Sequence, residues 1–285
     1  MTIYSGLDNT WTKEHDSGRE FVALKTWSTT PVFNIDAGVD ISYRDSATNG
    51  NTWNDLAGSG TNVDLNGNGQ SAPTFVGDGY GSFDYDGVSD GSWGSPPHNT
   101  TFGNISNNYT YIIWALPDDT ITLHTEGNSN IVGTSGQRWL IGATNTGAAG
   151  DIYSGMGISM GTNGIQVAEH SGAYLPILTK YDNGNAVSGG LISTTKFTQV
   201  VVVTTTSGST SGNPYHKIYI NGSLVKIGVE SAKAIVYANK GGPSIGYGSY
   251  GRFSGNIASV KLFNTALTNA QILREFKAYR WRYEV

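Results

Sequence analysis

Carboxylates at a fixed spacing are the residues of this chain that could carry hydrolytic chemistry. The pattern Glu-x-Asp-x-x-Glu sets two carboxylates about 5 Å apart on one face of a strand, the geometry of a retaining glycosidase. Its nearest match is the segment Glu14-His-Asp16-Ser-Gly-Arg-Glu20. The second glutamate comes one residue late, and a shift of one residue turns a strand side chain to the other face. We therefore expect no catalytic residues here and a protein that is not an enzyme.

Glu169 and His170 form an acid–imidazole pair that is adjacent in sequence. Adjacent residues of a strand point to opposite faces, so the two cannot act together inside a strand. We expect a structural role, in which they close the strand at 164–168 and bond to loop backbone. Gly246 and Gly248 are interpreted as turn glycines.

Asp84, Asp86 and Asp90 have a spacing that could ligate Ca²⁺. However, no acidic residue closes a twelve-residue calcium loop at the required distance. A turn at Asp86-Gly87 that ends a strand is the favoured interpretation. Binding of Ca²⁺ is left open, with no residues assigned as ligands, and no metal site or cofactor is predicted.

Aromatic residues near predicted loops are the candidates for ligand binding. Sugars stack on loop aromatics and hydrogen-bond to Asn or Asp, whereas the alternative for each aromatic is packing in the core or in a subunit interface. The candidate ligand-binding residues are Trp93, His98, Trp139, Tyr174 and Tyr181.

Short β-branched and aromatic segments, separated by Gly and Asn, predict strands that would position these loops. Within them, Val200–Val203 shows no alternation and predicts burial on both faces. Ile218 and Ile220 alternate with Lys217 and Tyr219, which is typical of a half-buried strand. Asn221-Gly222 predicts a tight type I′ hairpin. The clearest strands are expected at 109–115, 138–141, 164–168, 197–204, 216–220 and 257–263.

One helix is expected, close to the C-terminus. Thr268 and Gln271 fit a capping box at its start. Ile272, Leu273, Phe276 and Tyr279 follow at three- and four-residue spacing. This apolar stripe predicts that the helix packs on the β-structure.

The composition excludes several classes of protein. The 285 residues include 14% charged residues and no cysteine, with a net charge of −5. No basic stripe is present to bind nucleic acid, and no disulfide or thiolate metal site is possible. The first twenty residues show no signal peptide, and the most apolar run, Val200–Val203, is too short for membrane insertion.

Several blocks in the right order resemble a known family. They are a Phe-Asn-Ile-Asp-Ala-Gly strand, a Thr-Trp-Asn-Asp-Leu loop, a Phe-Asp-Tyr-Asp-Gly segment, an Ile-Tyr-Ile-Asn-Gly hairpin and a closing strand and helix. The blocks are 33–38, 52–56, 82–90, 161–174, 197–222 and 255–283. At two positions the family's pattern has Trp and His, whereas this chain has Phe197 and Gln199. Residues 31–285 thus resemble the concanavalin A-like/laminin G-like (LamG) jelly-roll domains of tailed-phage virion structural proteins.

The resemblance implies an all-β fold, a two-sheet antiparallel jelly-roll sandwich over residues 31–285 with one short C-terminal α-helix. Residues 1–30 would be an N-terminal arm. One alternative is that this arm is an extra edge strand or a frayed terminus, and the other is that it docks on a neighbouring subunit. The implied function is that of a phage virion structural protein, a head-decoration, tail or fibre component. It would bind other virion proteins and copies of itself, and be found in virions assembled in the host cytoplasm.

Fold does not fix function, however. The alternative is a carbohydrate-binding receptor or lectin module for a host-surface glycan, a role that could coexist with the first. A glycoside hydrolase has the least support.

Overall fold

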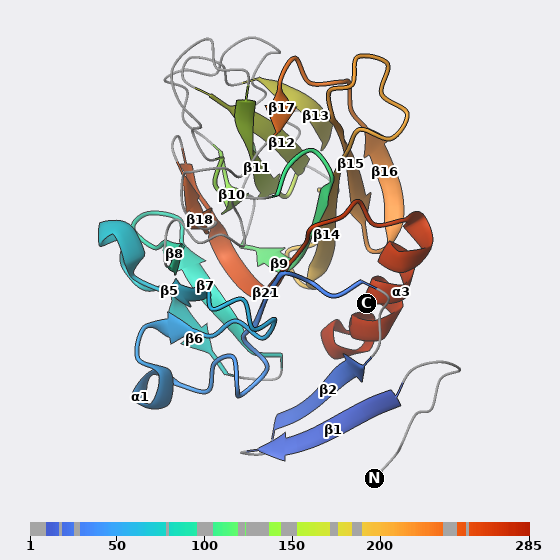
Figure 1. The fold of residues 1–285 in the computed structure, drawn as a ribbon. Coiled ribbons are helices and arrows are strands. Elements are labelled where there is room, and N and C mark those ends of the chain that lie inside the picture. Colours follow the sequence, from blue (N-terminus) through green and yellow to red (C-terminus); the bar gives the residue numbers. More distant parts are fainter. Residues whose placement is uncertain are drawn as a thin grey trace.

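The chain forms a β-sandwich in which two large, mostly antiparallel sheets face each other (Figure 1). The computed structural model describes residues 10–16, 19–25, 29–77, 80–95, 105–118, 123, 137–143, 153–171, 176–183, 190–235, 244–248 and 251–285. Within these residues, no helix is long and apolar enough to span a membrane. The predicted all-β sandwich is confirmed.

The first sheet has nine strands and carries three of the predicted binding aromatics. Eight of its strands form one path, and the ninth, β17 (Ala234–Ile235), pairs in parallel with β11. The order along the path is β13 (Ile177–Asp182), β12 (Gly164–His170), β11 (Tyr153–Gly161), β10 (Trp139–Ile141), β18 (Ser244–Ile245), β8 (Ser92–Ser95), β5 (Asn62–Asp64) and β4 (Thr52–Trp53).

The second sheet has eight strands and contains the most apolar segments of the chain. Its path is β16 (Ser223–Ile227), β15 (Tyr215–Ile220), β14 (Thr198–Thr205), β9 (Tyr109–Pro117), β21 (Ser254–Phe263), β7 (Ser82–Asp86) and β6 (Thr74–Val76), with β3 (Phe33–Asp36) paired to β21. All six predicted strands are present. Asn221 and Gly222 adopt φ of 49° and 77°, as a type I′ turn requires, so the predicted hairpin is confirmed.

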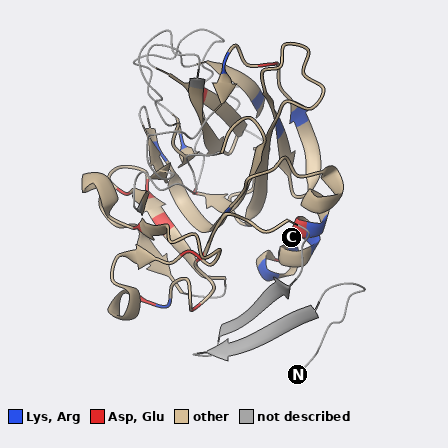
Figure 2. Cartoon of the chain, in the orientation of Figure 1, with Lys and Arg blue, Asp and Glu red and all other residues tan. Residues whose placement is uncertain are grey.

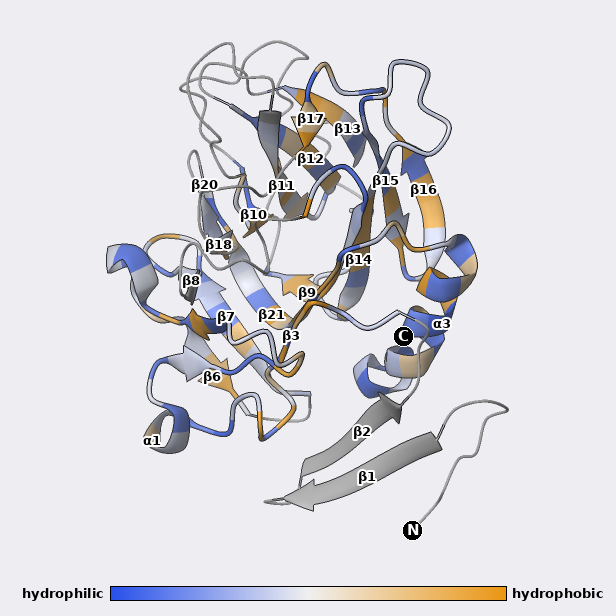
Figure 3. Cartoon of the chain, viewed as in Figure 1, coloured by the Kyte–Doolittle hydropathy of each residue, from blue (hydrophilic) through white to orange (hydrophobic). Residues whose placement is uncertain are grey.

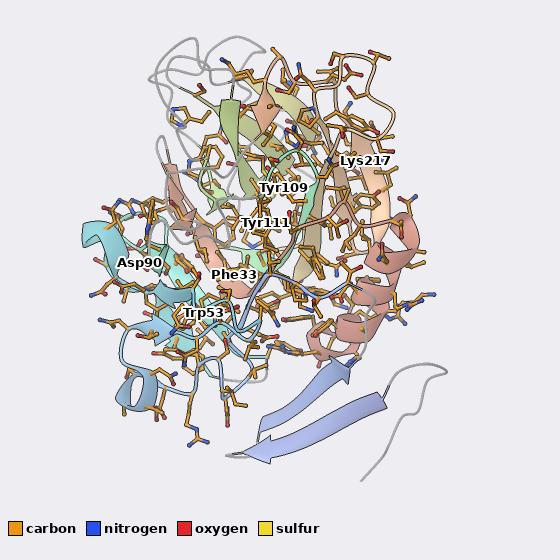
Figure 4. All side chains as sticks on the ribbon, in the orientation of Figure 1. Phe33, Trp53, Asp90, Tyr109, Tyr111 and Lys217 are labelled. Atoms are coloured by element: carbon orange, nitrogen blue, oxygen red, sulfur yellow. The ribbon has the colours of Figure 1, made fainter. Side chains whose placement is uncertain are left out.

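The main core lies between the two sheets, where aromatic rings interlock. Tyr109 and Tyr111 of β9 lie near the middle of the molecule, with Phe33 and Trp53 below them in the view of Figure 4. The Trp53 and Phe83 ring centroids are 4.7 Å apart. Figure 3 shows hydrophobic residues along the central strands. The whole of β14 is buried, which confirms the prediction for Val200–Val203.

Helix α3 (Asn269–Tyr279), extended by the 3₁₀ turn η2 (Arg280–Tyr283), covers the outer face of the eight-stranded sheet. The predicted capping box is present between Thr268 and Gln271. Ile272 is buried against the sheet, but the prediction for Leu273 is wrong because this residue is 40% exposed. Glu275 takes a buried place instead, since residues three apart share a helix face.

The helix also changes the environment of β15. Tyr219 is buried rather than on a solvent face, and its hydroxyl donates to Oδ1 of Asn269, 2.7 Å away. The half-buried strand expected from alternation is therefore buried on both faces around Tyr219.

A one-turn helix, α1 (Ser46–Asn49), and the 3₁₀ turn η1 (Gly67–Gly69) lie in loops.

Before the sandwich, the chain forms a separate hairpin of β1 (Thr10–Asp16) and β2 (Arg19–Lys25). These two strands pair with each other and with none of the other described strands. A second small hairpin, β19 (Tyr247–Gly248) with β20 (Gly251–Arg252), follows β18.

Candidate functional site

A partly exposed tryptophan on the nine-stranded sheet is the best-placed of the predicted binding residues that the structure describes. Trp93 lies on β8, where its neighbour Ser92 points inward and its hydroxyl lies 2.9 Å from the Tyr85 hydroxyl in the core. Because strand residues alternate, the Trp93 indole is on the outer face of the sheet. It is not buried there, unlike Ser92 and Gly94 on either side.

Tyr247 of β19 lies beside Trp93, with ring centroids 6.1 Å apart and planes tilted by 47°. Two glycines make this arrangement possible. A Cβ added to Gly91 would lie 2.5 Å from Cδ1 of Tyr247, and one added to Gly67 would lie 2.8 Å from Cβ of Trp93. Tyr247 is itself only 7% exposed, so it supports the more open Trp93 ring.

Polar groups surround these rings. Asn68, in a left-handed conformation with φ of 59°, donates from Nδ2 to the Tyr247 hydroxyl at 3.3 Å. Gln70 donates to the Asn68 carbonyl at 3.0 Å. The Arg252 guanidinium carbon lies 5.7 Å from the Tyr247 ring centroid, and its Nη1 donates to the Asp90 carbonyl at 3.0 Å. Burial raises the pKa of Tyr247, with smaller opposing effects from Asn68, Ser244 and Arg252.

We name Trp93, Tyr247, Asn68, Gln70 and Arg252 the Trp93 site. Asn68 is exposed, and Gln70 and Arg252 are half-buried, so amide and guanidinium groups lie at the rim of an aromatic surface. Such a surface can stack an apolar sugar face while the amides and guanidinium hydrogen-bond to hydroxyls. Asp90, labelled in Figure 4, lies at the turn that Arg252 holds in place.

The other predicted aromatics are placed differently. Trp139 is on β10 but is only 1% exposed, packed against Ala168 and Ile177, so its ring is a core element and not the loop aromatic expected from the sequence. Tyr181 lies on β13, half-buried and packed against the main core. His98 and Tyr174 lie outside the described residues.

The sequence reasoning missed Tyr247, Asn68 and Arg252 as site residues. Tyr247 stands between Gly246 and Gly248, for which the sequence predicts only a turn. The turn exists, since Gly246 has φ of 75°, and it projects Tyr247 toward Trp93. An aromatic residue between turn glycines is the available signal, although Tyr247 and Trp93 are 154 positions apart in the sequence.

Glu169 and His170 point to opposite faces of β12, as predicted. His170 Nδ1 lies 3.3 Å from the Ala143 carbonyl, which is the expected bond to loop backbone, and burial lowers the pKa of His170. Glu169 instead faces inward to His216 and Ser231. Its backbone amide donates to the carbonyl of the loop residue Pro176 at 3.1 Å, so the expected bond to loop backbone is present, and the opposing sheet supplies His216 as a partner for the carboxylate.

The turn at Asp86-Gly87 is confirmed, and Gly87 has φ of 70°. The Asp86 carboxylate accepts bonds from the amides of Val88, Ser89 and Asp90 and from the Ser89 hydroxyl. Burial alone would raise the pKa of Asp86, but these bonds outweigh it and lower the pKa to about 2. Within the described part of the chain, no group of three His, Cys, Asp or Glu side chains could hold a metal ion.

The segment with the spaced carboxylates is a hairpin and not one strand. In its backbone register Glu14 is the partner of Phe21, and Glu20 is the partner of His15. The chain therefore reverses between Asp16 and Arg19, which the single-strand pattern does not include.

Comparisons with known proteins agree with this architecture. The family model described as "Concanavalin A-like lectin/glucanases superfamily" matches residues 89–273. No curated protein sequence matches the chain.

Solved structures with a similar fold are distant in sequence. Domain 4 of AbnA, an extracellular arabinanase from Geobacillus stearothermophilus solved with arabinotriose, has 16% identity and a TM-score of 0.52, over 86% of this chain and 98% of that one. The binding domain of Paraclostridial mosquitocidal protein 1 has 12% identity and a TM-score of 0.56, over 87% and 52%.

A structure of botulinum neurotoxin type C, whose cell entry is described as dependent on two ganglioside molecules, has 13% identity and a TM-score of 0.55, over 87% and 51%. This chain therefore spans about half the length of the two toxin structures. At these identities the likeness concerns the fold.

Proposed function

The chain belongs to the concanavalin A-like lectin/glucanases superfamily, and from that premise we propose that it is a non-catalytic binding module that recognises a glycan. The observation that carries the proposal is the partly exposed Trp93 ring beside Tyr247, with Asn68, Gln70 and Arg252 around it. A flat aromatic bordered by amides is suited to a sugar, which has an apolar face and a ring of hydroxyls.

The solved relatives give this proposal further support. AbnA domain 4 was solved with an arabinose oligosaccharide, and the type C neurotoxin is described as using gangliosides. Both ligands are carbohydrates or carry them. Because the identities are low, these ligands indicate a class of partner and no particular sugar.

The placement of the carboxylates supports a role without catalysis. Glu169 is fully buried between the sheets, where substrate has no access, and it is engaged by His216 and Ser231. Glu14 and Glu20 lie on different strands of the first hairpin and are not register partners. We propose that binding requires no metal ion, so that a chelator leaves it unchanged.

A glycan array probed with the whole chain tests the proposal. Trp93→Ala should lower affinity at least tenfold for any glycan bound, since an aromatic stacking contact contributes about 0.5–1.5 kcal/mol beyond its buried area. Tyr215→Ala is a matched control, because Tyr215 is a half-buried aromatic at a distant strand end. Equal loss in both variants, or full binding by Trp93→Ala, would refute the site. Release of reducing ends from the bound glycan would refute the absence of catalysis.

We also propose that the module is part of a phage virion, as a head-decoration, tail or fibre component that binds virion proteins and copies of itself. The sequence blocks that resemble virion domains support this, as does the self-paired hairpin of β1 and β2. An isolated two-stranded hairpin has marginal stability in water, so a partner that covers it would stabilise it. Deletion of residues 1–30 should leave a folded sandwich that no longer joins particles, and normal incorporation would contradict the proposal.

A further inference from the structure

A carboxylate, that of Asp64, lies directly beside Trp93 on the outer face of the nine-stranded sheet. Asp64 is the register partner of Trp93 across the β5–β8 pair. Val63 and Leu65 on either side of it are buried in the main core, so the Asp64 side chain points outward. Trp93 points the same way, and directly opposed side chains of neighbouring strands have Cβ atoms about 4.5–5.5 Å apart.

The 3₁₀ turn η1 packs against both side chains at Gly67. A Cβ added to Gly67 would lie 2.8 Å from Trp93 Cβ and 3.3 Å and 3.5 Å from Asp64 Cβ and Cγ. Oδ1 of Asp64 accepts from the Asn66 backbone amide at 3.3 Å. Within the described residues, Oδ2 has no hydrogen-bond partner, and the side chain is only half-buried. A carboxylate oxygen is therefore open to a ligand that lies on the Trp93 ring.

The cation of the Trp93 site is engaged elsewhere. Arg252 donates from Nη1 to the carbonyls of Ser89 and Asp90, at 3.4 Å and 3.0 Å. Burial raises the pKa of Asp90, and the charge of Arg252 acts against that rise. Among the described side chains, no ion pair joins Arg252 to Asp64. Figure 2 shows acidic residues in red around β5, β7 and β8. An anionic group on a ligand would thus meet an open carboxylate in an acidic part of the surface.

The chemistry of these groups favours an uncharged sugar. A carboxylate only accepts hydrogen bonds, and two adjacent hydroxyls of a sugar ring can donate to it while the apolar face of the ring stacks on Trp93. Sialic and uronic acids carry a carboxylate of their own, which Asp64 repels. A protonated amine is repelled in turn by Arg252, whose guanidinium carbon lies 5.7 Å from the Tyr247 ring centroid.

We propose that Asp64 is a specificity-determining residue of the Trp93 site and makes it selective for neutral glycans that present adjacent hydroxyls. The inference rests on the proposed glycan-binding function and adds the class of sugar to it. Oδ2 accepts from a ligand hydroxyl while Oδ1 keeps the Asn66 amide. Thr52 of β4 is the register partner of Asp64 on its other side and is half-buried. A glycan that extends across the strands past Asp64 therefore meets a second hydrogen-bonding side chain.

A glycan array that carries each neutral oligosaccharide beside a sialylated or uronic-acid counterpart tests the inference on the whole chain. The wild-type protein should bind neutral members and not their acidic counterparts. Calorimetric titration with the neutral oligosaccharide of strongest signal then compares variants. Asp64→Asn should bind it about tenfold more weakly, because a neutral amide replaces a charged acceptor. The same variant should discriminate less against the acidic counterpart.

Glu230→Gln is the matched control, since it removes the same charge from a carboxylate that accepts the backbone amides of Thr210 and Ser211, in the loop after β16. Circular dichroism and thermal unfolding establish that each variant folds. Loss of binding in Trp93→Ala with full binding by Asp64→Asn would overturn the inference and leave the proposed function standing. So would a preference for acidic or amino sugars, or an equal effect of Glu230→Gln. A wild-type chain that binds no glycan would instead contradict the proposed function itself, and the inference with it.

Discussion

Glu169 of β12 and His216 of β15 join the two sheets, with Oε1 of one 3.2 Å from Nε2 of the other and both side chains fully buried. The pair is the centre of a small network. Thr204 Oγ1 lies 3.0 Å from His216 Nδ1, and Ser231 Oγ donates to Glu169 Oε2 at 2.7 Å. Both ring nitrogens and both carboxylate oxygens thus have partners, as buried polar groups require.

Removing one member of this pair should destabilise the sandwich strongly. His216→Leu leaves the Glu169 carboxylate buried without its histidine partner, and the loss of one partner from a buried pair costs about 3–5 kcal/mol. Denaturant unfolding measures this. Glu169→Leu combined with His216→Leu should cost clearly less than the sum of the single changes, because no uncompensated charge remains. Additive losses would show that the two side chains do not interact.

A second buried pair fixes α3 to the sheet. Lys261 Nζ lies 2.9 Å from Glu275 Oε2 and 3.8 Å from the Tyr279 ring centroid. Burial by itself lowers the pKa of Lys261, but the Glu275 carboxylate outweighs it and the pKa is raised.

We expect Glu275→Ala to lower the free energy of unfolding by about 3–5 kcal/mol. Lys261→Met with Glu275→Leu should stay near the wild-type value, because apolar side chains of similar size replace the pair. Thermal unfolding compares the two. A double variant as unstable as Glu275→Ala would indicate that the pair stabilises through specific geometry that packing cannot replace.

The turn at Asp86 should respond to acid. Its pKa of about 2 lies below the ordinary 3.8, so its contribution to stability is full above the ordinary value and is lost as pH falls toward 2. Asp86→Asn should be less stable than wild type at neutral pH and lose less stability between about pH 4 and pH 2. Unfolding curves at several pH values measure the difference. Parallel losses in both proteins would contradict it.

Gly91→Ala should impair ligand binding without unfolding the protein. Its Cβ would lie 2.5 Å from Tyr247 Cδ1 and 2.9 Å from Gln70 Cγ, so these two side chains of the Trp93 site must shift. Gly77→Ala is the control, since its Cβ would approach only the edge of Phe75, at 3.2 Å. Titration with a glycan found on the array should show weaker binding for Gly91→Ala alone. Unchanged affinity would mean that the position of Tyr247 is immaterial.

Local chemistry in the sequence determined much of the fold. The strand at Val200–Val203, the Asn221-Gly222 turn and the Thr268 capping box all depend on residues within a few positions of each other, and all three are present. The inward direction of His216 was also available, since it has the same parity as Ile218 in its strand. What the sequence did not supply was the identity of its partner.

The tertiary structure alone decided which distant residues meet. It brings Tyr247 to Trp93 and Glu169 to His216, and it buries Trp139 and Tyr219 that local pattern left near solvent. These outcomes follow from the order of strands in the sheets and from the placement of α3. Alternation along a strand tells which residues share a face of the sheet, but whether that face is buried depends on what packs against it. The sequence thus determined a sandwich with candidate aromatics, and packing between its layers decided that, among the described candidates, Trp93 stays partly exposed while Trp139 is buried.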